Sequence, residues 1–242
     1  MSANDTSIAL DEDVYPDTSL LITEDGKPVD NLFVEYLYRL LTEPLWTSWT
    51  APEGKPFRVL ANVGLFFKYK EPPLVPDVMF ALDVEPPKDP RHKDNRSYFI
   101  WIVGKAPDIV IEIVSDKRGR EDSEKMRAYE RVGVKYYVIF DPDEILNEGV
   151  LRAYCLSPDK YRPIDPSRFG DTGLGLTLWD GEYNGATNTW LRWIDSTGKV
   201  VPTGKEKADA EKALGQAAMD RVRQLEDRLR SAGLSLNGSP QV

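Results

Sequence analysis

Two short apolar segments separated by an amphipathic one limit most strongly what this chain can fold into. Residues 109–114 and 136–140 are almost continuously apolar, which is typical of strands that are covered on both faces. Between them, residues 122–132 place apolar side chains at helical spacing, and Gly133 follows as a residue that commonly ends a helix. A strand, a helix and a strand in this order predict a right-handed crossover and a parallel strand pair.

The rest of the chain gives weaker signals for further elements. We expect a helix from Asp30 or Asn31 to about Leu41, a strand or hairpin from Arg58 to Lys70, a strand from Val75 to Val84, a polar loop over 86–96, strands and turns from Leu151 to Val201, and a helix from Lys205 to Ala232. Within the strand-rich part, Asp180-Gly181 and Thr197-Gly198 are dipeptides that favour turns.

These segments suggest one domain with appendages. We expect an acidic, mobile arm over 1–27, a domain over 28–202, a C-terminal helix over 203–233 and a tail over 234–242. The C-terminal helix carries an apolar stripe with coiled-coil-like spacing, formed by Leu214, Ala218, Val222, Leu225 and Leu229. This stripe either packs back on the domain or joins two chains in a homodimer.

Composition restricts where such a chain works. Cys155 is the single cysteine, so no disulfide can form within the chain, which suits a reducing cytoplasm. No segment approaches the roughly 20 apolar residues that cross a membrane. The net charge of −9 argues against nucleic-acid binding. However, residues 1–30 contain eight acidic residues and one lysine, so the remainder is nearly neutral and contains basic clusters at 88–96 and 117–120.

Glu112 is the chemically informative residue of the first apolar segment. Alternation along a strand places it on one face with Val110 and Val114, while Ile109, Ile111 and Ile113 take the other face. A carboxylate between two apolar faces needs a cation, a proton or a set of hydrogen-bond donors, because burying its charge alone is costly. A salt bridge to a nearby lysine or arginine is one solution, and a bound metal ion is the other.

Two further charged residues favour the metal ion. Asp77, after Pro76, opens the apolar strand Val78–Leu82, and Lys125 lies at the edge of the inward stripe of the following helix. The two carboxylates and the amine are therefore expected to meet at the ends of neighbouring strands. Carboxylate oxygens suit Mg²⁺, with Mn²⁺ as a substitute, and Lys125 could hold or deprotonate a water or neutralise a phosphate.

An ordered set of motifs resembles the Uma-type family of predicted restriction endonucleases, within the PD-(D/E)XK superfamily. The motifs are Pro76-Asp77, the segment from Pro107-Asp108 through Glu112 to Ser115, the segment from Asp122 through Lys125 to Tyr129, and the segment from Gly133 to Asp141-Pro142. The resemblance continues through Leu174-Gly175-Leu176, Thr189–Trp193 and Arg228–Leu234, so that it covers roughly residues 20 to 235.

The resemblance implies a restriction-endonuclease-like fold, a mixed sheet flanked by helices, acting on DNA. Asp77 and Glu112 would be metal ligands and catalytic residues. The chain departs from the superfamily pattern at Val114, where a lysine is expected, so the lysine role passes to Lys125. Glu35 in the first helix is a further candidate ligand, although a solvent-facing glutamate is the simpler interpretation.

Three functions remain as hypotheses from the sequence. The first is a metal-dependent DNA endonuclease, for which double-strand cleavage would require a homodimer that the C-terminal helix could support. The second is a non-catalytic nucleic-acid-binding or regulatory protein on a degenerate nuclease fold, and the third is an oligomerisation or scaffold protein built on the C-terminal helix. The remaining candidates point to structure: His92 to an exposed loop, Cys155 to a buried strand, and Gly170, Gly173 and Gly175 to turns without phosphate-binding spacing.

Overall fold

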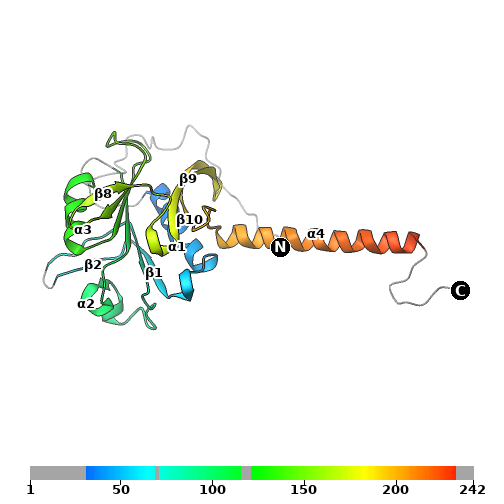
Figure 1. Ribbon diagram of the computed structural model, residues 1–242, viewed down its shortest axis with the longest axis horizontal. Helices are drawn as coiled ribbons and strands as arrows, with labels where there is room; N and C mark the ends of the chain where they lie inside the picture. The colour runs from blue at the N-terminus through cyan, green and yellow to red at the C-terminus, as the bar shows by residue number, and fades with distance from the viewer. Residues whose placement is uncertain (1–30, 69–70, 116–120, 233–242) are drawn as a thin grey trace, which may run out of the picture.

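The computed structural model describes residues 31–68, 71–115 and 121–232, apart from the side chains of residues 121 and 122 (Figure 1). The arm predicted for 1–27, the tail predicted for 234–242 and the basic cluster Lys117, Arg118 and Arg120 lie outside these ranges. Among the described residues, no helix combines the length and the apolar character that crossing a membrane requires.

A six-stranded mixed sheet forms the centre of the molecule. Its strands are β1 (Phe57–Ala61), β3 (Val78–Leu82), β5 (Ile109–Ile113), β6 (Tyr136–Phe140), β7 (Leu151–Leu156) and β8 (Tyr161–Ile164), adjacent in that order. β5 and β6 are parallel, and all other neighbours are antiparallel. The sheet therefore confirms the parallel pair, and the mixed α/β fold, predicted from the sequence.

Each face of the sheet is covered by different elements (Figure 1). On one face, Ile109, Ile111 and Ile113 join a core with helix α1 (Leu32–Thr47) and the hairpin of β9 (Leu174–Tyr183) and β10 (Ala186–Asp195). On the other face, Val110 and Val114 pack with helix α3 (Met126–Val132) and with a small parallel sheet of β2 (Leu65–Phe66) and β4 (Tyr98–Phe99), which leads into helix α2 (Ile100–Val103). The alternation predicted along β5 is confirmed.

Helix α1 begins as predicted but ends later. Asn31 caps it by accepting a hydrogen bond from the Val34 backbone N–H at 3.0 Å. The helix continues past Leu41 to Thr47 and contains Pro44, which the sequence pattern placed beyond its end. Leu45 is fully buried in the core, and burial of this last turn compensates for the hydrogen bond that a proline cannot donate.

Two predictions about the strands differ from the structure, because pairing between strands decides both. The region predicted as a strand or hairpin from Arg58 contains two strands that do not pair with each other, since β1 pairs with β3 and β2 pairs with β4. Gly181 does not form a turn but lies inside β9, where a Cβ would come within 2.2 Å of the Trp179 ring. The hairpin turns at Asn184 and Gly185, both with positive φ, whereas the predicted turn at Thr197-Gly198 is confirmed.

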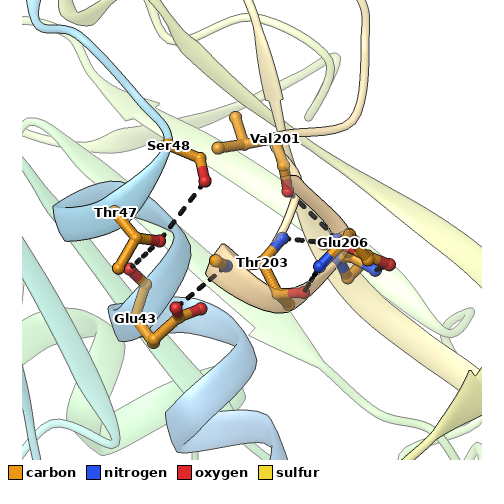
Figure 2. A network of polar contacts seen from close by, with 8 residues as sticks. Glu43, Thr47, Ser48, Val201, Thr203 and Glu206 are labelled. Atoms are coloured by element: carbon orange, nitrogen blue, oxygen red, sulfur yellow. Dashed lines mark hydrogen bonds and ion pairs between the residues drawn. The ribbon is translucent and has the colours of Figure 1, made fainter. Parts of the chain in front are cut away.

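Helix α4 (Gly204–Ser231) extends away from the body and contains no buried residue (Figure 1). Its first turn is anchored, because Thr203 and Glu206 form a reciprocal capping box and Glu43 accepts a hydrogen bond from Gly204 N at 2.9 Å (Figure 2). Glu206 also pairs with the buried Arg192 at 2.7 Å. The prediction that this helix packs back on the domain is therefore wrong, while the predicted helix itself is present.

Candidate metal and catalytic site

Glu112 lies in β5 with its side chain completely buried. Its Oε2 accepts a hydrogen bond from Lys125 Nζ at 2.7 Å, and its Oε1 accepts one from Tyr129 Oη at 2.6 Å. Both donors come from the segment after β5, where a single π-helical turn (Glu121–Lys125) leads into α3. Lys125 and Tyr129 are four residues apart and so share one side of this segment, facing Glu112.

The surroundings of Glu112 oppose its ionisation. Burial raises the pKa of Glu112 to about 8, with a further increase from the nearby charge of Asp77, while Lys125 and the two hydrogen bonds act to lower it. Burial and Glu112 likewise raise the pKa of the Tyr129 hydroxyl well above its ordinary value. The site therefore stabilises a proton, or another positive charge, on the Glu112 carboxyl group.

Asp77 is placed beside Glu112 by the pairing of β3 with β5. Val78 lies opposite Ile111 in this antiparallel pair, so the residue before Val78 reaches the level of Glu112. Asp77 Oδ2 accepts a hydrogen bond from the Ile113 backbone N–H at 2.7 Å, and Oδ1 accepts one from Tyr38 Oη of α1 at 2.7 Å. The structure thus brings together the three residues predicted for the site, Asp77, Glu112 and Lys125.

The two carboxylates suit a hard divalent cation. Mg²⁺ commonly binds one or two protein carboxylates and completes its shell with water, so it does not need a cage of protein ligands. The described residues contain no group of three or more Asp, Glu, His or Cys that could hold a metal ion by themselves. A cation beside Asp77 and Glu112 would offset the mutual repulsion that raises the pKa of Glu112.

Lys125, rather than residue 114, is the lysine that contacts Glu112. Glu112 and Val114 point to the same face of β5, and Val114 is buried in the core on that face. A lysine at 114 would project onto this face directly from β5. Lys125 instead reaches Glu112 from the π-helical turn that follows β5 in the chain. Isolated π-helical turns are rare and are frequently found at functional sites.

Other candidates from the sequence have structural partners instead. Glu35 pairs with Arg39 at 2.6 Å on the exposed surface of α1, and His92 lies exposed near Asp94. Cys155 is a half-buried free thiol in β7. Asp108, which follows Pro107, pairs with Lys105 and accepts a hydrogen bond from the Leu82 backbone N–H.

Tyr38 and Tyr129 were missed as site residues by sequence reasoning. Both lie on apolar helical stripes, where a tyrosine has the same spacing as any core residue. Their hydroxyl groups nevertheless bond to Asp77 and Glu112. The one signal that could have indicated this role is the placement of Tyr129 one turn after Lys125, on the side of the helix already assigned to the site.

Residues 10–178 of the chain match the model of the Uma2 family, whose description is "Putative restriction endonuclease". The chain belongs to the Uma2 family. The matched range includes Asp77, Glu112 and Lys125 and ends inside β9, so β10 and α4 lie beyond it. No curated protein matches the chain. The family resemblance stated from the sequence motifs is therefore confirmed over the central sheet.

Proposed function

We propose that this Uma2 protein is a Mg²⁺-dependent endonuclease that hydrolyses phosphodiester bonds of DNA. One observation carries the proposal. Glu112 is fully buried and contacts Lys125 at 2.7 Å, and Asp77 accepts a hydrogen bond at 2.7 Å from the backbone N–H of Ile113, the residue after Glu112. Two acidic groups from adjoining strands and one basic group from the turn that follows are groups that metal-assisted phosphodiester hydrolysis can use. Membership of the Uma2 family supports the same reaction class.

Asp77 and Glu112 would hold the metal ion, and Mn²⁺ could replace Mg²⁺. The ion supplies electrostatic stabilisation of the charge that develops on the phosphate and acidifies the attacking water. In the reaction, the water oxygen forms a bond to phosphorus as the P–O bond to the leaving group breaks. The proton of the water passes to bulk solvent, and the leaving oxygen takes up a proton from solvent. Lys125 Nζ either orients this water or neutralises the phosphate as the negative charge builds up.

The neighbouring tyrosines would position the two acidic groups. Tyr129 fixes one oxygen of Glu112 with a hydrogen bond of 2.6 Å, and Tyr38 fixes one oxygen of Asp77 with a hydrogen bond of 2.7 Å. Each carboxylate oxygen has a second lone pair, so these hydrogen bonds are compatible with metal binding. The rotamers of both acids are thereby set before any ligand binds, which lowers the entropic cost of assembling the site.

The exposed basic loop over 86–96 is the proposed contact to the DNA backbone. Lys88, Arg91, Lys93 and Arg96 are all solvent-exposed, and the Arg96 guanidinium also bonds to the Arg91 carbonyl oxygen. Exposed lysine and arginine side chains bind phosphates in a salt-dependent manner because they release counterions. The proposed DNA affinity should therefore fall as salt increases.

The test is cleavage of supercoiled plasmid and single-stranded DNA at low salt with Mg²⁺ or Mn²⁺. We expect activity in the parent protein and at least about a 100-fold loss in Asp77→Asn, Glu112→Gln and Lys125→Met. Glu35→Gln is the matched control, because it makes the same chemical change at an exposed glutamate that pairs with Arg39. Metal binding is measured separately by calorimetry, where Asp77→Asn and Glu112→Gln should lose the signal and Lys125→Met should keep it.

Two results would contradict the proposal in different ways. Metal binding that survives in both Asp77→Asn and Glu112→Gln would remove these residues as ligands. DNA binding without cleavage under any divalent ion, by the parent and by Lys125→Met alike, would favour the non-catalytic nucleic-acid-binding function that Val114 suggests.

A further inference from the structure

Helix α4 exposes an apolar surface that the body does not cover. Leu214 is 72% exposed, Met219 68%, Val222 54% and Leu225 43%, and the described chain buries no residue of α4. The helix leaves the body after its anchored first turn, so this surface lies well away from the sheet (Figure 1). A solvated helix that buries nothing obtains little stability from its own propensity, which suggests that this surface has a partner.

The apolar side chains follow a heptad pattern. With Val222 and Leu229 at position a and Leu225 at position d, the small residues Gly215 and Ala218 occupy the preceding a and d positions. Leu214 then falls at position g and Met219 at position e, on the two sides of this small-residue layer. The outer positions are polar and carry both signs of charge, for example Asp220, Arg223 and Asp227, which is unlike the basic face of a membrane-bound helix.

The flanking residues select the orientation of a partner. In a parallel two-stranded coiled coil, position g of one helix meets position e of the next heptad in the other helix, five residues further along. This rule joins Leu214 to Met219 and Arg221 to Glu226 of a second copy, so an apolar pair and an ion pair both match. Antiparallel helices would instead bring g to g and e to e. In the register that packs Val222 against Leu225, this places Arg221 against Arg228 and Met219 against Glu226.

We propose that α4 joins two copies of this chain through a parallel coiled coil over residues 214–232. Neither Arg221 nor Glu226 has an ion-pair partner among the described residues, so both are available to a second copy. The first turn of α4 is fixed to the body by Thr203, by Glu43 and by the Arg192–Glu206 pair (Figure 2). In a parallel coiled coil, the two bodies therefore lie at the same end. This inference concerns assembly and does not depend on nuclease activity.

Sedimentation equilibrium of the full chain over a dilution series tests the proposal. We expect a monomer–dimer equilibrium, and a dimer dissociation constant at least about 100-fold higher in Leu225→Glu, because two buried leucines are lost and two negative charges face each other. Gln224→Glu is the matched control, since it adds the same charge on the same turn at an outer position. Its dissociation constant should change by no more than roughly twofold.

A charge exchange tests the orientation. Arg221→Glu should weaken the dimer several-fold by opposing Glu226, and Arg221→Glu combined with Glu226→Arg should restore it, because the pair is re-formed with its signs reversed. A monomer at every concentration, or a dimer that Leu225→Glu leaves intact, would overturn the coiled coil. A dimer weakened by Leu225→Glu but insensitive to Arg221→Glu, or not restored by the exchange, would overturn the parallel arrangement.

Discussion

At the scale of single residues, Glu112 combines two opposing requirements. Its position in β5 buries it completely, which favours the neutral carboxyl group, whereas Lys125 at 2.7 Å favours the carboxylate. Burial and Asp77 outweigh the lysine, so the pKa is raised to about 8 rather than lowered. A cation bound between the two acids would relieve the repulsion that Asp77 adds.

The raised pKa of Glu112 predicts how the metal-free protein responds to pH. A group that binds its proton more tightly when folded stabilises the fold at low pH, and this contribution is lost as pH rises from about 4.5 to about 8. The free energy of unfolding of the parent should therefore decrease across this window relative to that of Glu112→Gln, which has no proton to lose. Urea denaturation at several pH values, with a chelator present, measures the difference.

Glu35→Gln serves as the control for this pH dependence, because Glu35 is half-exposed and pairs with Arg39 on the surface of α1. Its stability should follow that of the parent across the whole window. If the difference between the parent and Glu112→Gln were constant from pH 4.5 to 8, the carboxyl group would not be titrating there, and the assigned environment of Glu112 would be wrong.

At the scale of elements, the sequence predicted best those segments whose pattern has a local cause. β5 and β6 carry nearly continuous apolar runs and α3 has helical spacing, and Gly133 ends α3 in the left-handed conformation that glycine readily adopts. The sequence could single out Asp77 and Glu112 as candidate site residues for a local reason. An acid in or beside an apolar strand is costly to bury unless a cation, a proton or hydrogen-bond donors compensate its charge. These signals need no knowledge of distant residues.

The missed features all depend on contacts between distant segments. Tyr38 is separated from Asp77 by 39 residues, so its hydroxyl partner could not be inferred from spacing. Asp77 and Asp108 both follow a proline and precede an apolar strand, and their different contacts become visible only in the fold, where Asp77 bonds to the Ile113 backbone and Asp108 pairs with Lys105.

The anchor of α4 gives a prediction at this same scale. Arg192 in β10 is 1% exposed, and its main charged partner is Glu206, which is 43% exposed. Glu206→Gln should lower the free energy of unfolding by up to about 3 kcal/mol, less than for a fully buried pair because water already screens the glutamate. Urea denaturation measures this loss.

Glu211→Gln is the control for this prediction, because it makes the same change on an exposed glutamate further along α4. Its free energy of unfolding should stay within about 0.5 kcal/mol of the parent value. Equal stability of Glu206→Gln and Glu211→Gln would show that the Arg192 pair does not hold α4 to the body.

At the scale of the whole molecule, the body and the exposed part of α4 are energetically separate. The core that surrounds Glu112 draws on α1, α3 and the sheets, whereas α4 contributes no buried residue and its anchoring contacts are confined to its first turns. The family match also ends before α4, inside β9. The body thus supplies the proposed chemistry, and the exposed part of α4 supplies the proposed assembly of two bodies.

This separation predicts the behaviour of a chain that ends after Ala213. The anchor formed by Thr203, Glu206 and Arg192 is kept, so the free energy of unfolding of the body should stay within about 0.5 kcal/mol of the parent value. The coiled-coil surface from Leu214 onward is lost, so the truncated chain should sediment as a monomer. Each catalytic site is intact, and nicking of one DNA strand should proceed at an unchanged rate per site.

Cutting of both strands should respond differently. Two bodies held on one coiled coil make the second cut an intramolecular event at a high effective concentration of the second site. The truncated chain and full-length Leu225→Glu should therefore both convert supercoiled plasmid to open circles and accumulate little linear DNA, while the parent forms linear DNA early. If the truncated chain formed linear DNA as early as the parent, double-strand cleavage would not require α4, and the coiled coil would serve a purpose other than pairing two catalytic sites.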